Sequence, residues 1–315
     1  MNFLKSNLLH LAMLAFVFIA TGAIGLNAKE QRQPGEPQAL IGKKFFPLRP
    51  LLKGGVKTYP VISAQAILVQ DLDSGVSLYE KNPDILVLPA STTKIITSLV
   101  AMDYYQPKNV LTVSGVLVEG QKMGLVSGEK ISVNDLLYGL LVYSANDAAE
   151  ALAQNYCDNN VTTTGQNCGR NYFIDAMNKK AHELGLKNTK FTNPSGLDGN
   201  SHYSTARDLV IVSAEAMKNP FFAQIVATTE KVVKSMDNKI VHKLININEL
   251  LGKVDGVLGV KTGWTEGARE NLVTYVDRGG KKVMIALLGS QDRFGETEEL
   301  INWIFDNYEW SEVVL

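Results

Sequence analysis

Residues 88–105 read LPASTTKIITSLVAMDYY. After the stop at Pro89 a helix is predicted over 91–105, because apolar side chains recur there at helical spacing: Ile95, Ile96, Leu99, Val100 and Met102. On its first turn Ser91 and Lys94 stand three residues apart, so their side chains share one face. A hydroxyl beside an amine is a candidate nucleophile with its own base, provided that burial, the helix N-terminus or a second cation lowers the lysine pKa.

Strand-like and helix-like segments alternate on both sides of this helix. Upstream, 66–72 and 76–79 are predicted to form a β-hairpin. Downstream, apolar periodicity predicts helices at 133–142, 147–156, 173–184, 205–218 and 296–308, and strands at 256–262, 271–276 and 282–288. Two strands at the start and three at the end, with helices between them, predict an α/β (α+β) fold with one antiparallel five-stranded sheet flanked by helices on both faces.

Composition excludes several classes of function. The 315 residues carry 31 basic and 32 acidic side chains, a net charge of -1, which argues against a nucleic-acid partner. The two Cys and four His do not stand at ligand spacing, so we expect no metal site and no cofactor. At roughly 150 residues per domain the length suits two domains, although one α/β unit of about 250 residues is also ordinary.

The N-terminal part differs from the rest of the chain. Residues 1–28 have a basic start and then an uncharged apolar run, as in a signal peptide or a membrane anchor. The run is longer than the ~7 to 15 residues of a signal-peptide core and close to the ~20 that span a bilayer, so both interpretations stay open. Residues 29–63 hold five of the ten prolines and are predicted to be a tether.

Two further triplets carry polar side chains suited to chemistry. Ser144-Ala145-Asn146 lies in the break between two predicted helices, and Lys261-Thr262-Gly263 lies at the end of a predicted strand. A role for the threonine hydroxyl requires that strand to be an edge along which a substrate lies, with Gly263 permitting close backbone approach. Two similar patterns have structural interpretations: residues 127–130 lie in a turn-like stretch, and residues 132–134 resemble a helix cap.

The order Ser-x-x-Lys, Ser-x-Asn, Lys-Thr-Gly resembles the penicillin-recognising serine enzymes, which include DD-peptidases and serine β-lactamases. Longer blocks are similar to the D-alanyl-D-alanine carboxypeptidase family, the low-molecular-mass penicillin-binding proteins. These blocks are LPASTTK at 88–94, LLYGLLVYSANDAA at 136–149, NPSGLD at 193–198 and KTGWT at 261–265. The resemblance implies a β-lactamase/DD-peptidase-like fold with an all-helical lobe, and a serine DD-peptidase domain at 64–315.

The resemblance also implies roles for the catalytic positions. Ser91 would attack the carbonyl between two D-alanines and form an acyl-enzyme, while Lys94 takes its proton. Ser144 would relay a proton to the leaving nitrogen. Asn146 would hydrogen-bond the substrate amide and hold Lys94.

The implied substrate contacts lie mainly on the strand of the third motif. Lys261 and the Thr262 hydroxyl would receive the terminal carboxylate, with help from Arg293. Backbone N–H groups of Ser91 and Trp264 would form the oxyanion hole. The implied partners are a peptidoglycan pentapeptide ending in D-Ala-D-Ala and β-lactam antibiotics as covalent inhibitors, in an extracytoplasmic location at the bacterial cell envelope, membrane-anchored or secreted.

Four alternatives stay open. A DD-endopeptidase that cuts crosslinks is one, because the likeness ends near the C-terminus, as in the shorter members of the family. A β-lactamase is another, but the nearest match to its Glu-x-x-Leu-Asn element, at 183–188, is one residue out of register. A transpeptidase and a non-catalytic cell-wall binding protein complete the set.

The remaining polar positions have mostly structural interpretations. Cys157 and Cys168 bracket a polar stretch, and in an exported protein a disulfide between them is expected, with a reactive thiol as the alternative. His202 is expected to organise a loop through a hydrogen bond. Asp147 is expected to cap a helix.

Overall fold

The computed structural model describes residues 48–56, 58–115, 117–157 and 168–312. The signal peptide or anchor expected at 1–28 lies outside the described residues, as does the tether as far as residue 47. In the part of the chain that is described, no helix combines the length and apolarity that crossing a membrane requires.

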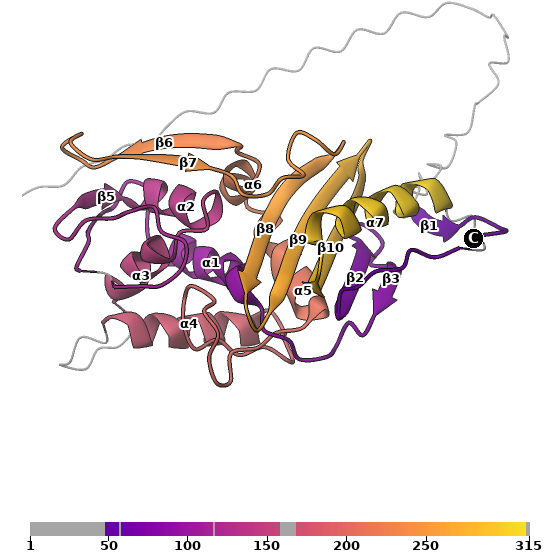
Figure 1. Cartoon of the computed structure of the whole chain (residues 1–315), viewed down its shortest axis with the longest axis horizontal. Helices are drawn as coiled ribbons and strands as arrows, with labels where there is room; N and C mark the ends of the chain where they lie inside the picture. Colours follow the sequence, from indigo (N-terminus) through magenta and orange to yellow (C-terminus); the bar gives the residue numbers. More distant parts are fainter. Residues whose placement is uncertain (1–47, 57, 116, 158–167, 313–315) are drawn as a thin grey trace, which may run out of the picture. The chain divides into compact units, whose positions relative to one another are not determined.

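A five-stranded antiparallel sheet forms the centre of the domain (Figure 1). Its order is β3 (Ser77–Lys81), β2 (Ala66–Asp71), β10 (Lys281–Ser290), β9 (Arg269–Arg278) and β8 (Val257–Thr265). The N-terminal hairpin therefore pairs with the C-terminal meander, with Val69 opposite Ile285. The expected sheet is confirmed, and β8 is its edge strand.

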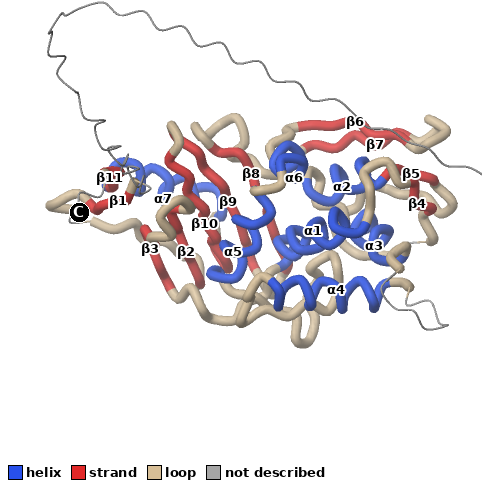
Figure 2. The backbone as a smooth tube through the Cα atoms, turned by 180° about the vertical axis from the view of Figure 1, so that it is seen from behind, coloured by secondary structure: helices blue, strands red, loops and turns tan. Residues whose placement is uncertain are grey.

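Side chains of the sheet alternate between two hydrophobic cores. In β10, Met284 and Ala286 belong to one core, and Val283 and Ile285 belong to the other. Because alternate residues of a strand point to opposite faces, a central strand buried on both faces is apolar at nearly every position. Helices cover both faces, with α7 on one (Figure 1) and α5 on the other (Figure 2).

Most helices form a lobe beside the sheet. The helical elements are η1 (Ala90–Thr93), α1 (Lys94–Tyr104), α2 (Val133–Leu141), α3 (Asn146–Gln154), α4 (Arg170–Glu183), α5 (Ala206–Met217), α6 (Pro220–Val226) and α7 (Arg293–Asn307). The lobe expected to be all-helical also carries two short antiparallel pairs, β4 (Val110–Thr112) with β5 (Lys130–Ser132), and β6 (Glu230–Lys234) with β7 (Val241–Ile245). Periodicity did not predict these strands, since none exceeds five residues.

The described end of the expected tether packs on the domain. Strand β1 (Arg49–Leu52) pairs with β11 (Tyr308–Ser311). Ile62 is buried in the core beneath α7, and the backbone N–H of Ser63 donates to the Glu296 carboxylate of that helix. The described residues between 48 and 63 thus belong to the same compact unit as the sheet.

Candidate active site

Ser91 and Lys94 meet at the start of α1. The single 3-10 turn η1 follows Pro89 and leads directly into the helix, which places the two side chains on one face. Lys94 is completely buried, whereas Ser91 is partly exposed. The Nζ atom of Lys94 lies 2.8 Å from the Oγ atom of Ser91.

The other partners of Lys94 are neutral oxygens. Its Nζ atom lies 2.7 Å from Asn146 Oδ1 and 2.5 Å from the carbonyl oxygen of Ser195. Burial lowers the pKa of Lys94 to about 7, although the charges of Asp147 and Glu150 oppose that shift. In the neutral amine, two N–H groups donate to Asn146 and Ser195, and the lone pair accepts from the Ser91 hydroxyl. Lys94 therefore has the surroundings of a general base.

The second motif lies where α2 ends and α3 begins. Ser144 is buried and has a φ of 62°, so the chain reverses sharply there. Asn146 is the first residue of α3, and its Nδ2 atom donates to the carbonyl oxygen of Glu119 at 2.7 Å. The break thus presents Ser144 and Asn146 on the same side as Ser91.

The third motif lies on edge strand β8, which passes close to η1. A Cβ atom on Gly263 would lie 3.1 Å from the backbone nitrogen of Ser91, so glycine permits this approach. Lys261 is buried, and its Nζ atom donates to the Thr262 carbonyl at 3.0 Å. Burial, the charge of Lys94 and the charge of Arg293 hold the pKa of Lys261 well below its usual value.

Arg293 begins α7 beside the same strand. Its Nη1 atom donates to the carbonyl oxygen of Gly263 at 3.1 Å. Its Nε atom is buried and makes no hydrogen bond to any described residue. Trp264, the next residue on β8, is 61% exposed. The guanidinium therefore lies beside the strand with hydrogen-bonding capacity unused.

These side chains surround one cavity of about 760 Å³. It is lined by residues of all three motifs and by the arginine: Ser91, Ser144, Asn146, Thr262, Gly263, Trp264 and Arg293. Lys94 and Lys261 do not line it but contact lining residues from beneath. The structure thus brings together every position that the sequence suggested for catalysis or substrate binding.

The sequence model of the D-alanyl-D-alanine carboxypeptidase family matches residues 55–292. This chain belongs to that family. It is 36% identical over 252 residues to the D-alanyl-D-alanine carboxypeptidase DacB2 of Mycobacterium tuberculosis, covering 77% of this chain and 82% of the relative. The expected family, fold class and enzyme class, a serine-type D-Ala-D-Ala carboxypeptidase, are confirmed.

Two other relatives bear on the alternatives. A D-alanyl-D-alanine endopeptidase of Pseudomonas aeruginosa is 32% identical over 260 residues, 80% of each chain. The crystal structure of a DD-transpeptidase from Streptomyces superposes with a TM-score of 0.73 at 32% identity, covering 79% of this chain and 100% of that one. Several relatives are longer, and the chain spans 63% or 64% of their length.

The loop at 193–198 supplies a hydrogen-bond acceptor to Lys94, a role that the sequence analysis did not predict. The Asn193 side chain accepts backbone N–H groups of Ser195, Gly196 and Leu197, and this turn aims the Ser195 carbonyl at Lys94. The Asn-Pro and Ser-Gly pairs were a turn signal, but a backbone carbonyl leaves no trace in the sequence.

The close approach of Gly196 to η1 can be tested by substitution. Gly196 has a φ of 88°, and a Cβ atom there would lie 1.9 Å from the Ala90 carbonyl oxygen. Gly196→Ala is expected to lower the free energy of unfolding by more than about 3 kcal/mol and to displace η1. Gly252→Ala is the control, because its φ is 73° but nothing lies within 4 Å. Equal destabilisation in urea titrations would show that the approach to η1 contributes nothing.

The remaining positions have structural surroundings. Ser127 and Lys130 flank a turn before β5, and Ser132 caps α2 by accepting from Asp135 N–H. Cys157 and Cys168 are joined by a disulfide. Among the described residues, no three His, Cys, Asp or Glu side chains form a group that could hold a metal ion.

His202 organises the loop beneath η1, as expected. Its Nδ1 atom accepts from the backbone N–H of Thr192 at 3.0 Å, so Nε2 carries the proton and donates to the Thr93 hydroxyl at 2.9 Å. Burial lowers the pKa of His202 to about 4. The imidazole is therefore neutral at physiological pH.

Proposed function

We propose that this carboxypeptidase removes the terminal D-alanine from peptidoglycan stem peptides through an acyl-enzyme at Ser91. The observation that carries the proposal is the 2.8 Å contact between Ser91 Oγ and the Nζ atom of fully buried Lys94. At a pKa of about 7, a large fraction of Lys94 is neutral at physiological pH and able to take a proton.

The proposed acylation starts from this contact between Ser91 and Lys94. Ser91 Oγ attacks the carbonyl carbon of the D-Ala-D-Ala bond while its proton passes to Lys94 Nζ. Backbone N–H groups of Ser91 and Trp264 stabilise the oxyanion, an effect typically worth ~10²- to 10³-fold per donor. Asn146 holds Lys94 and donates to the substrate amide.

Breakdown of the tetrahedral intermediate needs a proton on the departing nitrogen. Ser144 lines the cavity and relays to that nitrogen the proton that Lys94 took from Ser91, so that D-alanine leaves as a neutral amine and Lys94 is neutral again. Water then attacks the ester on Ser91, with Lys94 again as base, and releases the shortened peptide.

The terminal carboxylate of the substrate is the group that Lys261, Thr262 and Arg293 recognise. Arg293→Gln is expected to raise KM roughly 30- to 100-fold for a peptide ending in D-Ala-D-Ala, since a charged hydrogen bond contributes about 2 to 3 kcal/mol. The control is the same peptide with its C-terminus amidated, which lacks the negative charge. Its kcat/KM should be low with the wild-type enzyme and nearly unchanged by the substitution, whereas an equal loss on both peptides would contradict the assignment.

The function itself is tested by two assays on the full chain. A peptide ending in D-Ala-D-Ala should release free D-alanine, and fluorescent penicillin should label the protein covalently, with the adduct mapped to Ser91 by mass spectrometry. We infer that β-lactams are covalent inhibitors because they present a carboxylate and a reactive carbonyl to the same groups. A protein that binds the peptide without release or labelling would be a non-catalytic cell-wall module.

A DD-endopeptidase activity is the second candidate, and the endopeptidase relative in Pseudomonas aeruginosa supports it. The test compares a pentapeptide monomer with a crosslinked muropeptide dimer at equal concentration. Faster cleavage of the dimer would assign the endopeptidase. The choice between water and an acceptor amine, which separates a carboxypeptidase from a transpeptidase, is read from the products with added glycine.

We further propose an extracytoplasmic location, since peptidoglycan is the substrate, and attachment to the membrane through residues 1–28. Membrane fractionation and N-terminal sequencing of the mature protein test this. An N-terminus at residue 29 in the soluble fraction would assign a cleaved signal peptide instead.

A further inference from the structure

Residues 119–126 form a strap that crosses the lobe beside α3. The strap contains no helix or strand, and Gly120 and Gly124 both have positive φ angles. Its first part lies against Asn146, because a Cβ atom on Gly120 would come within 2.9 Å of Asn146 Nδ2. The backbone of the strap must therefore be held in place by contacts from outside it.

On its inner side the strap binds Asn146 and Asp147. Asn146 donates to the strap carbonyls of Glu119 and Gln121 through Nδ2 and the backbone N–H. The Asp147 carboxylate accepts the backbone N–H groups of Met123, Gly124 and Leu125 at 2.9 to 3.0 Å. The sequence predicted that Asp147 caps a helix. This prediction is wrong, because the N-cap of α3 is Ala145.

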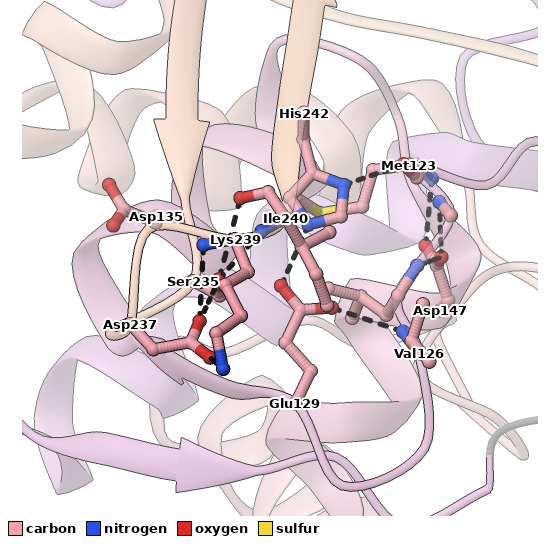
Figure 3. A network of polar contacts seen from close by, with 12 residues as sticks. Met123, Val126, Glu129, Asp135, Asp147, Ser235, Asp237, Lys239, Ile240 and His242 are labelled. Carbon is pink, nitrogen blue, oxygen red and sulfur yellow. Dashed lines mark hydrogen bonds and ion pairs between the residues drawn. The ribbon is translucent and has the colours of Figure 1, made fainter.

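On its outer side the strap is fastened by a buried pair (Figure 3). His242, on β7, lies with Nδ1 3.0 Å from the Met123 carbonyl oxygen and Nε2 2.8 Å from Glu129 Oε1. The other oxygen of Glu129 accepts the backbone N–H of Val126 at 3.0 Å. The His242 and Glu129 side chains are 3% and 0% exposed.

Both ring nitrogens of His242 thus face oxygen atoms. Nδ1 donates to the Met123 carbonyl in any protonation state that keeps this contact, since a carbonyl cannot donate. Nε2 faces the Glu129 carboxylate. Met123 is therefore held from two sides, by His242 at its carbonyl and by Asp147 at its N–H (Figure 3).

We propose that His242 and Glu129 are positioning residues for acylation, because they fasten the strap to the β6–β7 hairpin. The fastened strap holds Asn146 against Lys94, and it keeps its backbone N–H groups on the Asp147 carboxylate. This inference rests on the proposed function. Neither residue lines the cavity, and they act only through the strap and α3.

Releasing the strap should raise the pKa of Lys94. Asp147 loses three N–H donors, so its charge acts more strongly on the ammonium, and water that enters the gap also solvates the ammonium. The other charged or titratable groups that act on Lys94 are Glu150 on α3, Lys261 on β8 and His202 in the neighbouring loop. None of these three side chains makes a hydrogen bond or ion pair to a described residue of the strap, so the net effect is a higher Lys94 pKa.

The experiment measures the rate of penicillin acylation against pH in the full-length protein. His242→Ala and Glu129→Ala are each expected to shift the midpoint upward by about one pH unit and to slow acylation at pH 7 about fivefold, the loss of neutral amine for such a shift. Glu129→Gln should recover most of this loss. Its amide can donate to Nε2 of a neutral imidazole while its oxygen accepts the Val126 N–H.

Ser235→Ala is the matched control. Ser235 lies at the end of the same hairpin, and its hydroxyl bonds Asp237 and Ile240 but makes no hydrogen bond to a described residue of the strap or to Glu129. It should lower the melting temperature and leave the midpoint unchanged. If His242→Ala fails to fold, the inference is tested by comparing the midpoints of the acylation pH profiles of Glu129→Ala and Glu129→Gln. A midpoint equal to wild type in folded Glu129→Ala would overturn the inference, whereas wild-type protein that no penicillin labels would overturn the proposed function with it.

Discussion

Ser91→Ala is expected to abolish both D-alanine release and covalent penicillin labelling, with kcat falling by more than roughly 10⁴-fold. The reason is that Ser91 is the only hydroxyl within hydrogen-bonding distance of the Lys94 amine among the described residues. The fold should survive, because Ser91 is partly exposed and its hydroxyl bonds the Lys94 amine and no backbone group of the described residues. Intact-mass spectrometry after penicillin treatment, with a melting curve for each protein, measures both effects.

Ser127→Ala is the matched control for this experiment. It removes a hydroxyl from the other Ser-x-x-Lys pattern, which lies in a turn before β5 and not on a helix. Wild-type rates and full labelling are expected. If Ser91→Ala retained a penicillin adduct while Ser127→Ala lost it, the nucleophile would have been assigned to the wrong motif.

The Ser91–Lys94 pair was predictable because its geometry is local. Two side chains three residues apart on a helix must share a face, whatever the rest of the chain does. The long strands were also predictable, because their residues are buried alternately in two hydrophobic cores and are therefore apolar over a long run. Short elements lack such a pattern: α6 has an Asn219 cap and Pro220 at its first position, yet seven residues are too few for a period to show.

The parts of the site that could not be predicted are contacts made by backbone atoms or between distant segments. The Ser195 carbonyl on Lys94 depends on a turn that Asn193 closes. The strap depends on His242, which is more than a hundred residues away from Met123 in the sequence. Side-chain motifs identify the groups that react. The orientation of those groups depends on backbone N–H and C=O groups, which every sequence has, and on side chains far away in the sequence.

The pH dependence of acylation is the second prediction with a large effect. Lys94 acts as a base only when neutral, so the rate should be low in acid, rise with pH and level off, with its midpoint near the pKa of about 7. Lys94→Met should lower the plateau ~10²- to 10⁴-fold and remove the titration. Lys130→Met is the control, because Lys130 is exposed on β5 and belongs to the pattern without a helix.

The same substitution separates catalysis from folding. Burial lowers the folded-state pKa of Lys94 from 10.5 to about 7, so between these values the unfolded chain binds more protons than the native one. This group therefore makes wild-type stability rise with pH across that window, by up to ~1.4 kcal/mol per pH unit. The difference in unfolding free energy between wild type and Lys94→Met should follow this slope from pH 7 to 9. A flat difference would mean that Lys94 remains an ammonium ion in the folded protein, and that Ser91 needs another base.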